Sequence, residues 1–185
     1  MQGYIRAVDA VNFRVGRIAM YGIFLLMAIL LWSSINKTLF VPTLWTLEMA
    51  QFVMVAYYIL GGPYSIQLGS NVRMDLFYGG WSTRKKAWFD VMTVLLLIFY
   101  LCVLLYGAIS STAYSLGYWG SAPFSFFGGL ITGAEEIGTM ERSSSAWRPY
   151  LWPVKAVMIL GMFLMLLQCI SEFLKDVLRL KGETI

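Results

Sequence analysis

The amino-acid sequence predicts an all-α membrane protein with four transmembrane helices and both termini in the cytoplasm. Hydrophobic residues make up 59% of the 185 residues and charged residues only 13%, whereas soluble domains are about one quarter charged. In water, a chain of this composition would expose large apolar patches. The apolar residues also gather in four segments separated by short polar stretches. We therefore expect residues 1–185 to form a single membrane domain.

The first two predicted spans cover about residues 16–40 and 49–68. The first follows several arginines, as a signal peptide would, but Leu31-Trp32-Ser33-Ser34 offers no small-x-small cleavage site, so an uncleaved helix is expected. The second is interrupted by Gly61-Gly62-Pro63. This step either kinks the helix or allows another helix to approach closely.

The other two predicted spans cover about residues 87–114 and 153–174. No charged residue occurs between Asp90 and Glu135. The fourth apolar core, between Lys155 and Glu172, is shorter than the roughly 20 residues that cross a bilayer. These two side chains can extend the span by placing their charges at the interfaces.

The orientation follows from the positions of the basic residues. Ten of the 14 lie in the N-terminal tail, the connection between spans two and three, and the C-terminal tail: Arg6, Arg14, Arg17, Arg73, Arg84, Lys85, Lys86, Lys175, Arg179 and Lys181. The positive-inside rule places these three stretches in the cytoplasm. The protein is then a multi-pass component of the bacterial inner membrane.

Residues 117–152 form a long predicted periplasmic segment between spans three and four. Its stretch from Phe124 to Ile131 is more apolar and aromatic than an exposed loop usually is. We expect it to lie at the membrane surface or against a partner protein. A short re-entrant hairpin or a poorly ordered loop is the alternative.

The residue inventory removes most catalytic and cofactor chemistry. The chain has no histidine, so His-ligated haem and a Ser-His-Asp triad are excluded. Cys102 and Cys169 lie in apolar runs without a CxxC motif and are interpreted as packing residues. The basic residues are spread between the spans and form no nucleic-acid patch. We expect no enzyme activity, no cofactor, no metal and no nucleic-acid partner; membrane lipids are the expected surroundings.

Several polar residues near the spans are candidates for a structural or partner-binding role. Glu48 lies at the start of the second predicted span, three residues after Trp45. Its negative charge either interacts favourably with the positive end of the helix dipole or contacts a partner protein. Arg73 and Asp75 lie in a turn and are expected to order it by hydrogen bonding. Gln168 is a polar group in the apolar fourth span, suited to a bond between helices.

These residues also carry a resemblance to the small membrane subunit of tripartite ATP-independent periplasmic (TRAP) transporters. It rests on three stretches in order along the chain, from about residue 15 to 178: Trp45-x-x-Glu48 followed by Gly61-Gly62; Gly69-x-x-Val72-Arg73-x-Asp75-Leu76-Phe77 with Ser82-x-Arg84; and Trp147-x-Pro149-x-x-Trp152-Pro153-x-Lys155 with Leu160-Gly161 and Leu166-Leu167-Gln168. The segment from about 117 to 145 is longer than is usual in that family.

The resemblance implies a scaffold that does not itself carry substrate. In this family a large membrane subunit transports the substrate, commonly an organic acid, using a sodium gradient, and a periplasmic binding protein delivers it. The small subunit packs on the large one and helps to dock the binding protein. Ser33, Ser34, Gly61 and Gly62 are then expected at the interface with the large subunit. A membrane anchor of a redox enzyme is the alternative, which the lack of histidine disfavours.

Overall fold

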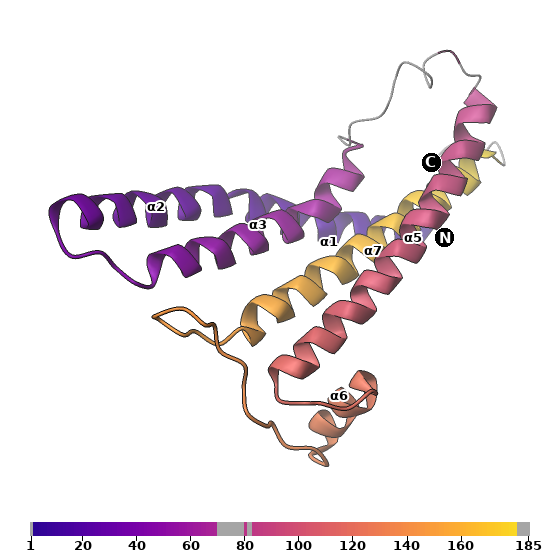
Figure 1. The fold of residues 1–185 in the computed structure, drawn as a ribbon. Coiled ribbons are helices and arrows are strands. Elements are labelled where there is room, and N and C mark those ends of the chain that lie inside the picture. The colour runs from indigo at the N-terminus through magenta and orange to yellow at the C-terminus, as the bar shows by residue number, and fades with distance from the viewer. Residues whose placement is uncertain (1, 70–79, 81–82, 181–185) are drawn as a thin grey trace.

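The computed structural model describes residues 2–69, 80 and 83–180. The described chain is helical, and its elements are α1 (Gln2–Met20), α2 (Gly22–Leu39), α3 (Thr46–Gln67), α5 (Thr83–Ser115), α6 (Pro123–Thr132) and α7 (Trp152–Leu180). The long helices run up and down along one another, so that the first turn of α1 and the last turn of α7 lie at the same end (Figure 1). In the described ranges the only extended pairing is an isolated bridge between Arg142 and Tyr150.

Helices α1 and α2 form one long rod with a joint at Tyr21. The Tyr21 amide bonds the Ile18 carbonyl at 3.1 Å, which tightens one turn without breaking the helix. The helix therefore begins at Gln2, well before the predicted start near residue 16. Ile5, Val8, Asn12 and Gly16 are buried and recur every three or four residues, so α1 turns one face to the rest of the protein.

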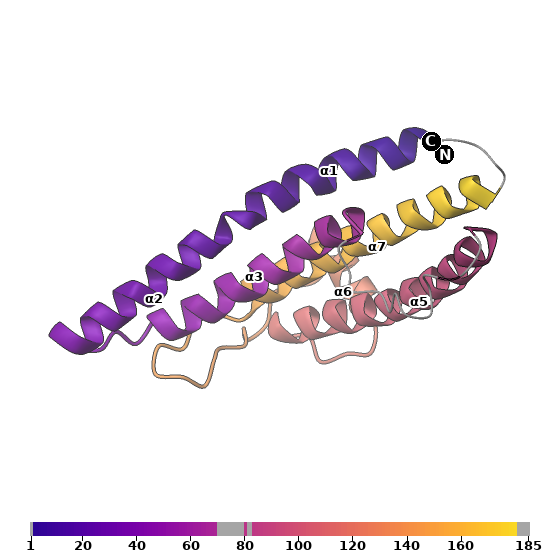
Figure 2. The same cartoon turned by 90° about the horizontal axis from the view of Figure 1, so that it is seen from above.

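The long helices lie in a row and do not close into a ring. Seen from above, α1 and α2 follow one edge, α3 and α7 lie between, and α5 follows the other edge (Figure 2). Helix α3 packs against α1, α2 and α7, whereas α5 packs chiefly against α7 and the short helix α6. Much apolar surface consequently faces outward, including Leu96 and Phe99 on α5.

Three helical stretches of the described residues are long and apolar enough to cross a membrane: Gln2–Leu39, Trp88–Ser115 and Trp152–Leu178. Helix α3 is not among them. Its apolar residues are diluted by Gln51, by three tyrosines and by the Gly61-Gly62-Pro63 step. Pro63 is buried, and the helix continues through it to Gln67.

Glycines set the close contacts between neighbouring helices. A Cβ on Gly16 would lie 2.3 Å from Tyr64 Cβ, and a Cβ on Gly161 would lie 2.1 Å from Ile59 Cγ2. The first contact joins α1 to α3, and the second joins α7 to α3. Small residues at such crossings let membrane helices gain van der Waals packing where the hydrophobic effect gives none.

Candidate functional site

A cluster of polar side chains joins α1 to α7 towards the end of the molecule where α1 begins and α7 ends. We call Asp9, Asn12, Gln168, Ser171, Glu172 and Lys175 the Asp9 cluster. Asn12 Nδ2 donates to Gln168 Oε1 at 2.7 Å, and Gln168 Nε2 donates to Asp9 Oδ1 and to Glu172 Oε1, both at 3.0 Å. Lys175 Nζ lies 2.8 Å from carboxylate oxygens of both Asp9 and Glu172. Each charge in the cluster is thus paired.

Helix α3 joins the same cluster through its last turn. Gln67 Nε2 donates to the Asp9 carbonyl at 3.2 Å, and Ser171 Oγ donates to Asp9 Oδ1 at 3.2 Å. Asp9 therefore bonds to both α3 and α7. In a bilayer such contacts are among the forces that hold helices in register.

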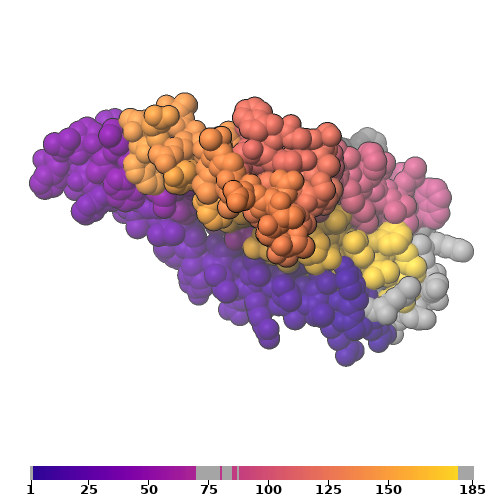
Figure 3. Space-filling view, turned by 90° about the horizontal axis from the view of Figure 1, so that it is seen from below, coloured from indigo at the N-terminus to yellow at the C-terminus, as the bar shows by residue number. Residues whose placement is uncertain are grey.

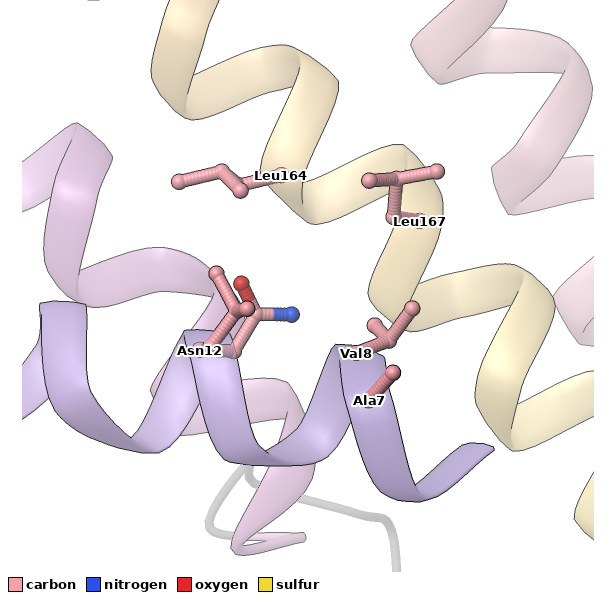
Figure 4. A pocket seen from close by; sticks show the side chains of 6 residues that line it. Ala7, Val8, Asn12, Leu164 and Leu167 are labelled. Atoms are coloured by element: carbon pink, nitrogen blue, oxygen red, sulfur yellow. The ribbon is translucent and has the colours of Figure 1, made fainter. Parts of the chain in front are cut away.

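A small cavity lies beside this cluster, between α1 and α7. It has a volume of about 150 Å³ and is lined by Ala7, Val8, Val11, Asn12, Leu164 and Leu167. Figure 4 shows Asn12 on α1 across from Leu164 and Leu167 on α7. The Asn12 side chain is 1% exposed, and its Oδ1 has no hydrogen-bond partner among the described residues. The other cavity walls are apolar, so the cavity offers no further polar group to a ligand.

The opposite end of the molecule holds a second cluster, formed by Glu141, Lys155, Ser115 and Ser111. Lys155 Nζ lies 2.6 Å from Glu141 Oε2 and donates to the Ser111 carbonyl at 3.2 Å. Ser115 Oγ donates to Glu141 Oε2 at 2.8 Å. The hydrogen bond from Lys155 lowers the pKa of the Glu141 carboxyl; burial opposes this, and the Ser115 bond adds to it. The cluster joins α5, α7 and the segment before α7.

Glu48 anchors that same segment to α3. The segment, residues 133–151, lies with α6 on one face of the molecule (Figure 3). Ser143 Oγ donates to Glu48 Oε1 at 2.7 Å, and the Ser143 amide bonds the Pro149 carbonyl at 2.9 Å. Glu48 is 7% exposed, and its Oε2 has no partner among the described residues. Its position in the first turn of α3 also suits a negative charge.

The aromatic and proline residues of the third sequence stretch lie at the end of this segment and at the start of α7. Trp147 and Trp152 are both exposed, as is Trp45 before α3. Pro149 supplies the carbonyl that Ser143 bonds, and Pro153 is the second residue of α7, where a proline leaves no helical bond unmade. The predicted residues Trp45, Glu48, Trp147, Pro149, Trp152, Pro153 and Lys155 thus lie at one end, and Gln168 lies at the other.

The residues expected at the partner interface divide into two groups. A Cβ on Gly62 would lie 2.7 Å from Met165 Sδ, and Ser33 Oγ is 3.0 Å from Thr46 Oγ1, so both positions make contacts within the chain. Gly61 has open space where its Cβ would be. Arg73 and Asp75 lie outside the described residues.

The sequence reasoning missed Asp9, Asn12 and Glu141. The first two fell in a stretch interpreted as an N-terminal tail, although the spacing of Ile5, Val8, Asn12 and Gly16 is a helical signal. Glu141 carries no local signal, because its partners Ser115 and Lys155 come from two different helices.

A comparison with protein families finds a match that covers most of the chain. The model of the family described as tripartite ATP-independent periplasmic transporters, DctQ component, matches residues 26–179. The comparisons with curated proteins and with solved structures found no match. The family match confirms the resemblance drawn from the sequence.

Proposed function

Because the chain belongs to the DctQ family of tripartite ATP-independent periplasmic transporter components, we propose that it is the non-transporting scaffold subunit of such a transporter. It is a small component of a transporter, and its family is not one of enzymes. In this proposal it packs on the large membrane subunit, which moves an organic acid with a sodium gradient. It also helps to dock the periplasmic binding protein.

The pairing of charges carries the scaffold proposal. Lys175 is paired with both Asp9 and Glu172 towards one end, and Lys155 is paired with Glu141 at the other. Charged groups of a transport path within the membrane usually face a bundle interior or a water-filled cavity. In this chain the paired charges instead connect one helix to another, or a helix to the segment before α7. Such connections favour a rigid scaffold on which a partner subunit can move.

We also propose that α3 crosses the membrane, in addition to the three stretches named above, which gives four spans with both termini in the cytoplasm. Helix α3 has 22 residues, which is enough to cross about 30 Å of hydrocarbon, and it lies along two helices that qualify as spans. It carries no charged residue after Glu48. An even number of spans agrees with the shared end of α1 and α7 (Figure 1).

Reporter fusions test this topology. Green fluorescent protein at the C-terminus should fluoresce, and alkaline phosphatase joined after residue 136 should be active, because only the periplasm supports that enzyme's disulfides. Phosphatase joined after Gln67 should be inactive. An active enzyme at Gln67 would remove α3 from the set of spans.

The proposed docking surface for the binding protein is the segment 133–151. Its exposed charges include Glu135, Glu136, Arg142 and Arg148, while Glu48 and Glu141 attach its base to α3 and α7. A firmly held loop loses little conformational freedom on binding, which favours docking. Reversing Arg142 and Arg148 to glutamate should weaken binding of the periplasmic protein. The same changes should leave the complex between the two membrane subunits intact.

Co-purification tests the function as a whole. A tag on this chain, co-expressed with the large subunit of the transporter, should recover both proteins in mild detergent. Vesicles holding both subunits and the binding protein should accumulate substrate under a sodium gradient. Vesicles with this chain alone should not. Uptake by the large subunit without this chain would contradict the scaffold proposal.

A further inference from the structure

Helix α6 is an apolar helix without a single charged residue. It runs from Pro123 to Thr132 with the sequence PFSFFGGLIT, and it lies beside the C-terminal end of α5 (Figure 1). It ends at Gly133, whose φ of 74° is the left-handed conformation that closes many helices. Glu135 and Glu136 follow and are exposed. Charged residues therefore appear only after the helix has ended.

The inner face of α6 is fixed to α5 by aromatic packing. Phe126 is 2% exposed, stacks on Tyr118 at 4.7 Å between ring centroids, and shares a small core with Ala113 and Leu116. Gly129 lies under the Glu135 side chain, since a Cβ there would be 2.6 Å from Glu135 Cγ. The protein itself therefore sets the orientation of α6.

The outer face of α6 is apolar and exposed. Phe124 is 61% exposed and Ile131 is 86% exposed, and Trp119 just before the helix is 76% exposed. The Phe124 ring lies 6.0 Å from the Tyr106 ring on α5. Tyr106, Val103 and Phe99 belong to the outward surface of α5, a helix apolar enough to cross the membrane. The exposed face of α6 thus continues the lipid-facing surface of α5.

The polar side chains of α6 bond to the backbone of the same segment. Ser125 Oγ donates to the Ala122 carbonyl at 2.8 Å, and Thr132 Oγ1 donates to the Gly128 carbonyl at 3.1 Å. A protein interface normally forms about one hydrogen bond for every 100–200 Å². Lipid requires instead that polar groups be satisfied within the segment. The hydroxyls of α6 meet the second condition.

We propose that α6 is an interfacial helix whose Phe124–Ile131 face is inserted among the lipid acyl chains beside α5. Trp119 then lies at the headgroup level, where tryptophan is favoured, and Glu135 and Glu136 lie in water. The assignment of α6 to the periplasmic leaflet rests on the proposed topology, whereas its insertion into lipid does not. Lipid is the occupant of this surface, both in the free chain and in the transporter complex.

Depth-dependent quenching tests the insertion. In a background with Cys102→Ser and Cys169→Ser, single cysteines replace Ile131 or Glu136, and each carries the environment-sensitive fluorophore NBD. The labelled transporter complex is placed in phosphatidylcholine vesicles, with or without brominated acyl chains. NBD at residue 131 should lose at least half of its fluorescence to brominated lipid and resist aqueous iodide. NBD at residue 136, the matched control on the same segment, should show the reverse.

Two results would overturn the proposal. Iodide quenching at residue 131 equal to that at residue 136 would place α6 in water. Bromolipid quenching of the chain alone that disappears when the large subunit is added would make that protein the occupant. Failure of the two subunits to co-purify would contradict the proposed function, yet the quenching measured on this chain alone would still decide whether α6 enters lipid.

Discussion

The side-chain amide of Asn12 donates a 2.7 Å hydrogen bond to Gln168 Oε1, although 156 positions separate the two residues in the sequence. Gln168 is completely buried, and its side-chain amide donates hydrogen bonds to Asp9 and Glu172. The bond therefore links an amphipathic N-terminal helix to the ion pairs of the C-terminal helix. It makes α1 part of the folded unit.

A double-mutant cycle should measure this link. We expect Asn12→Ala and Gln168→Ala to be coupled by about 1 kcal/mol in the free energy of unfolding, since bonds between membrane helices contribute about 0.6 and up to roughly 1.7 kcal/mol. Reversible unfolding in mixed detergent micelles gives the four values. Asn12→Ala combined with Ser33→Ala, at the other end of the rod, should be additive to within about 0.5 kcal/mol. Additivity of the first pair would show that the bond contributes nothing.

Two glycine substitutions should have opposite outcomes. Gly161→Ala drives a methyl group into Ile59 and should destabilise the protein by roughly 1–3 kcal/mol. Gly61→Ala has open space and should be neutral, or stabilising by up to about 1 kcal/mol through helix propensity. Melting temperatures of the two variants in one detergent compare them directly. Equal losses would mean that the α3–α7 contact is looser than described.

The Glu141–Lys155 pair should make stability depend on pH. Lys155 lowers the pKa of Glu141 in the folded protein, so the pair stabilises the fold above the ordinary value of 4.5. This contribution is lost as the pH falls through the lowered folded-state pKa. Glu141→Gln should therefore melt below the wild type at pH 7, and the gap should narrow as the pH falls below 4.5 and through the lowered pKa of Glu141. Glu136→Gln, an exposed control in the same segment, should leave a gap near zero throughout. A gap at Glu141 that does not change with pH would contradict the ion pair.

Glu48 should control how firmly the segment 133–151 is held. Glu48→Ala removes the acceptor of Ser143, so the segment should open more often. Trypsin added on the proposed periplasmic side should then cut after Arg142 several times faster than in the wild type, whereas the Arg148–Pro149 bond is not a trypsin site. Glu48→Gln keeps an oxygen acceptor and should stay near the wild-type rate. Equal cleavage of all three proteins would show that another contact holds the segment.

The apolar runs were sufficient to predict an all-helical membrane protein, because a bilayer requires a long uncharged helix for each span. They were not sufficient for α1, whose arginines and Asp9 lower its hydropathy although one face of it is buried. They also missed α6, since two glycines and a proline in ten residues favour a loop when considered locally.

The candidate site divides in a similar way. Glu48, Lys155 and Gln168 were identifiable as polar groups next to apolar runs. Their partners Ser143, Glu141 and Asn12 were not, because hydrogen bonds across more than a dozen residues leave no spacing pattern in a single sequence. The expectation for Arg73 and Asp75 concerns residues outside the described ranges and stays a prediction.

The row of helices also constrains the order of assembly in the cell. Helix α3 can pack against the α1–α2 rod as soon as it has been synthesised, whereas α5 has to wait for its main partner α7. During that interval α5 has to persist in lipid as a solitary helix. Its uninterrupted uncharged stretch from residue 91 to 115 suits it to do so, because each backbone polar group is satisfied inside the helix and the apolar side chains need no protein neighbour. The last helix to be synthesised, α7, then brings the earlier helices together, because it packs against α1, α3 and α5.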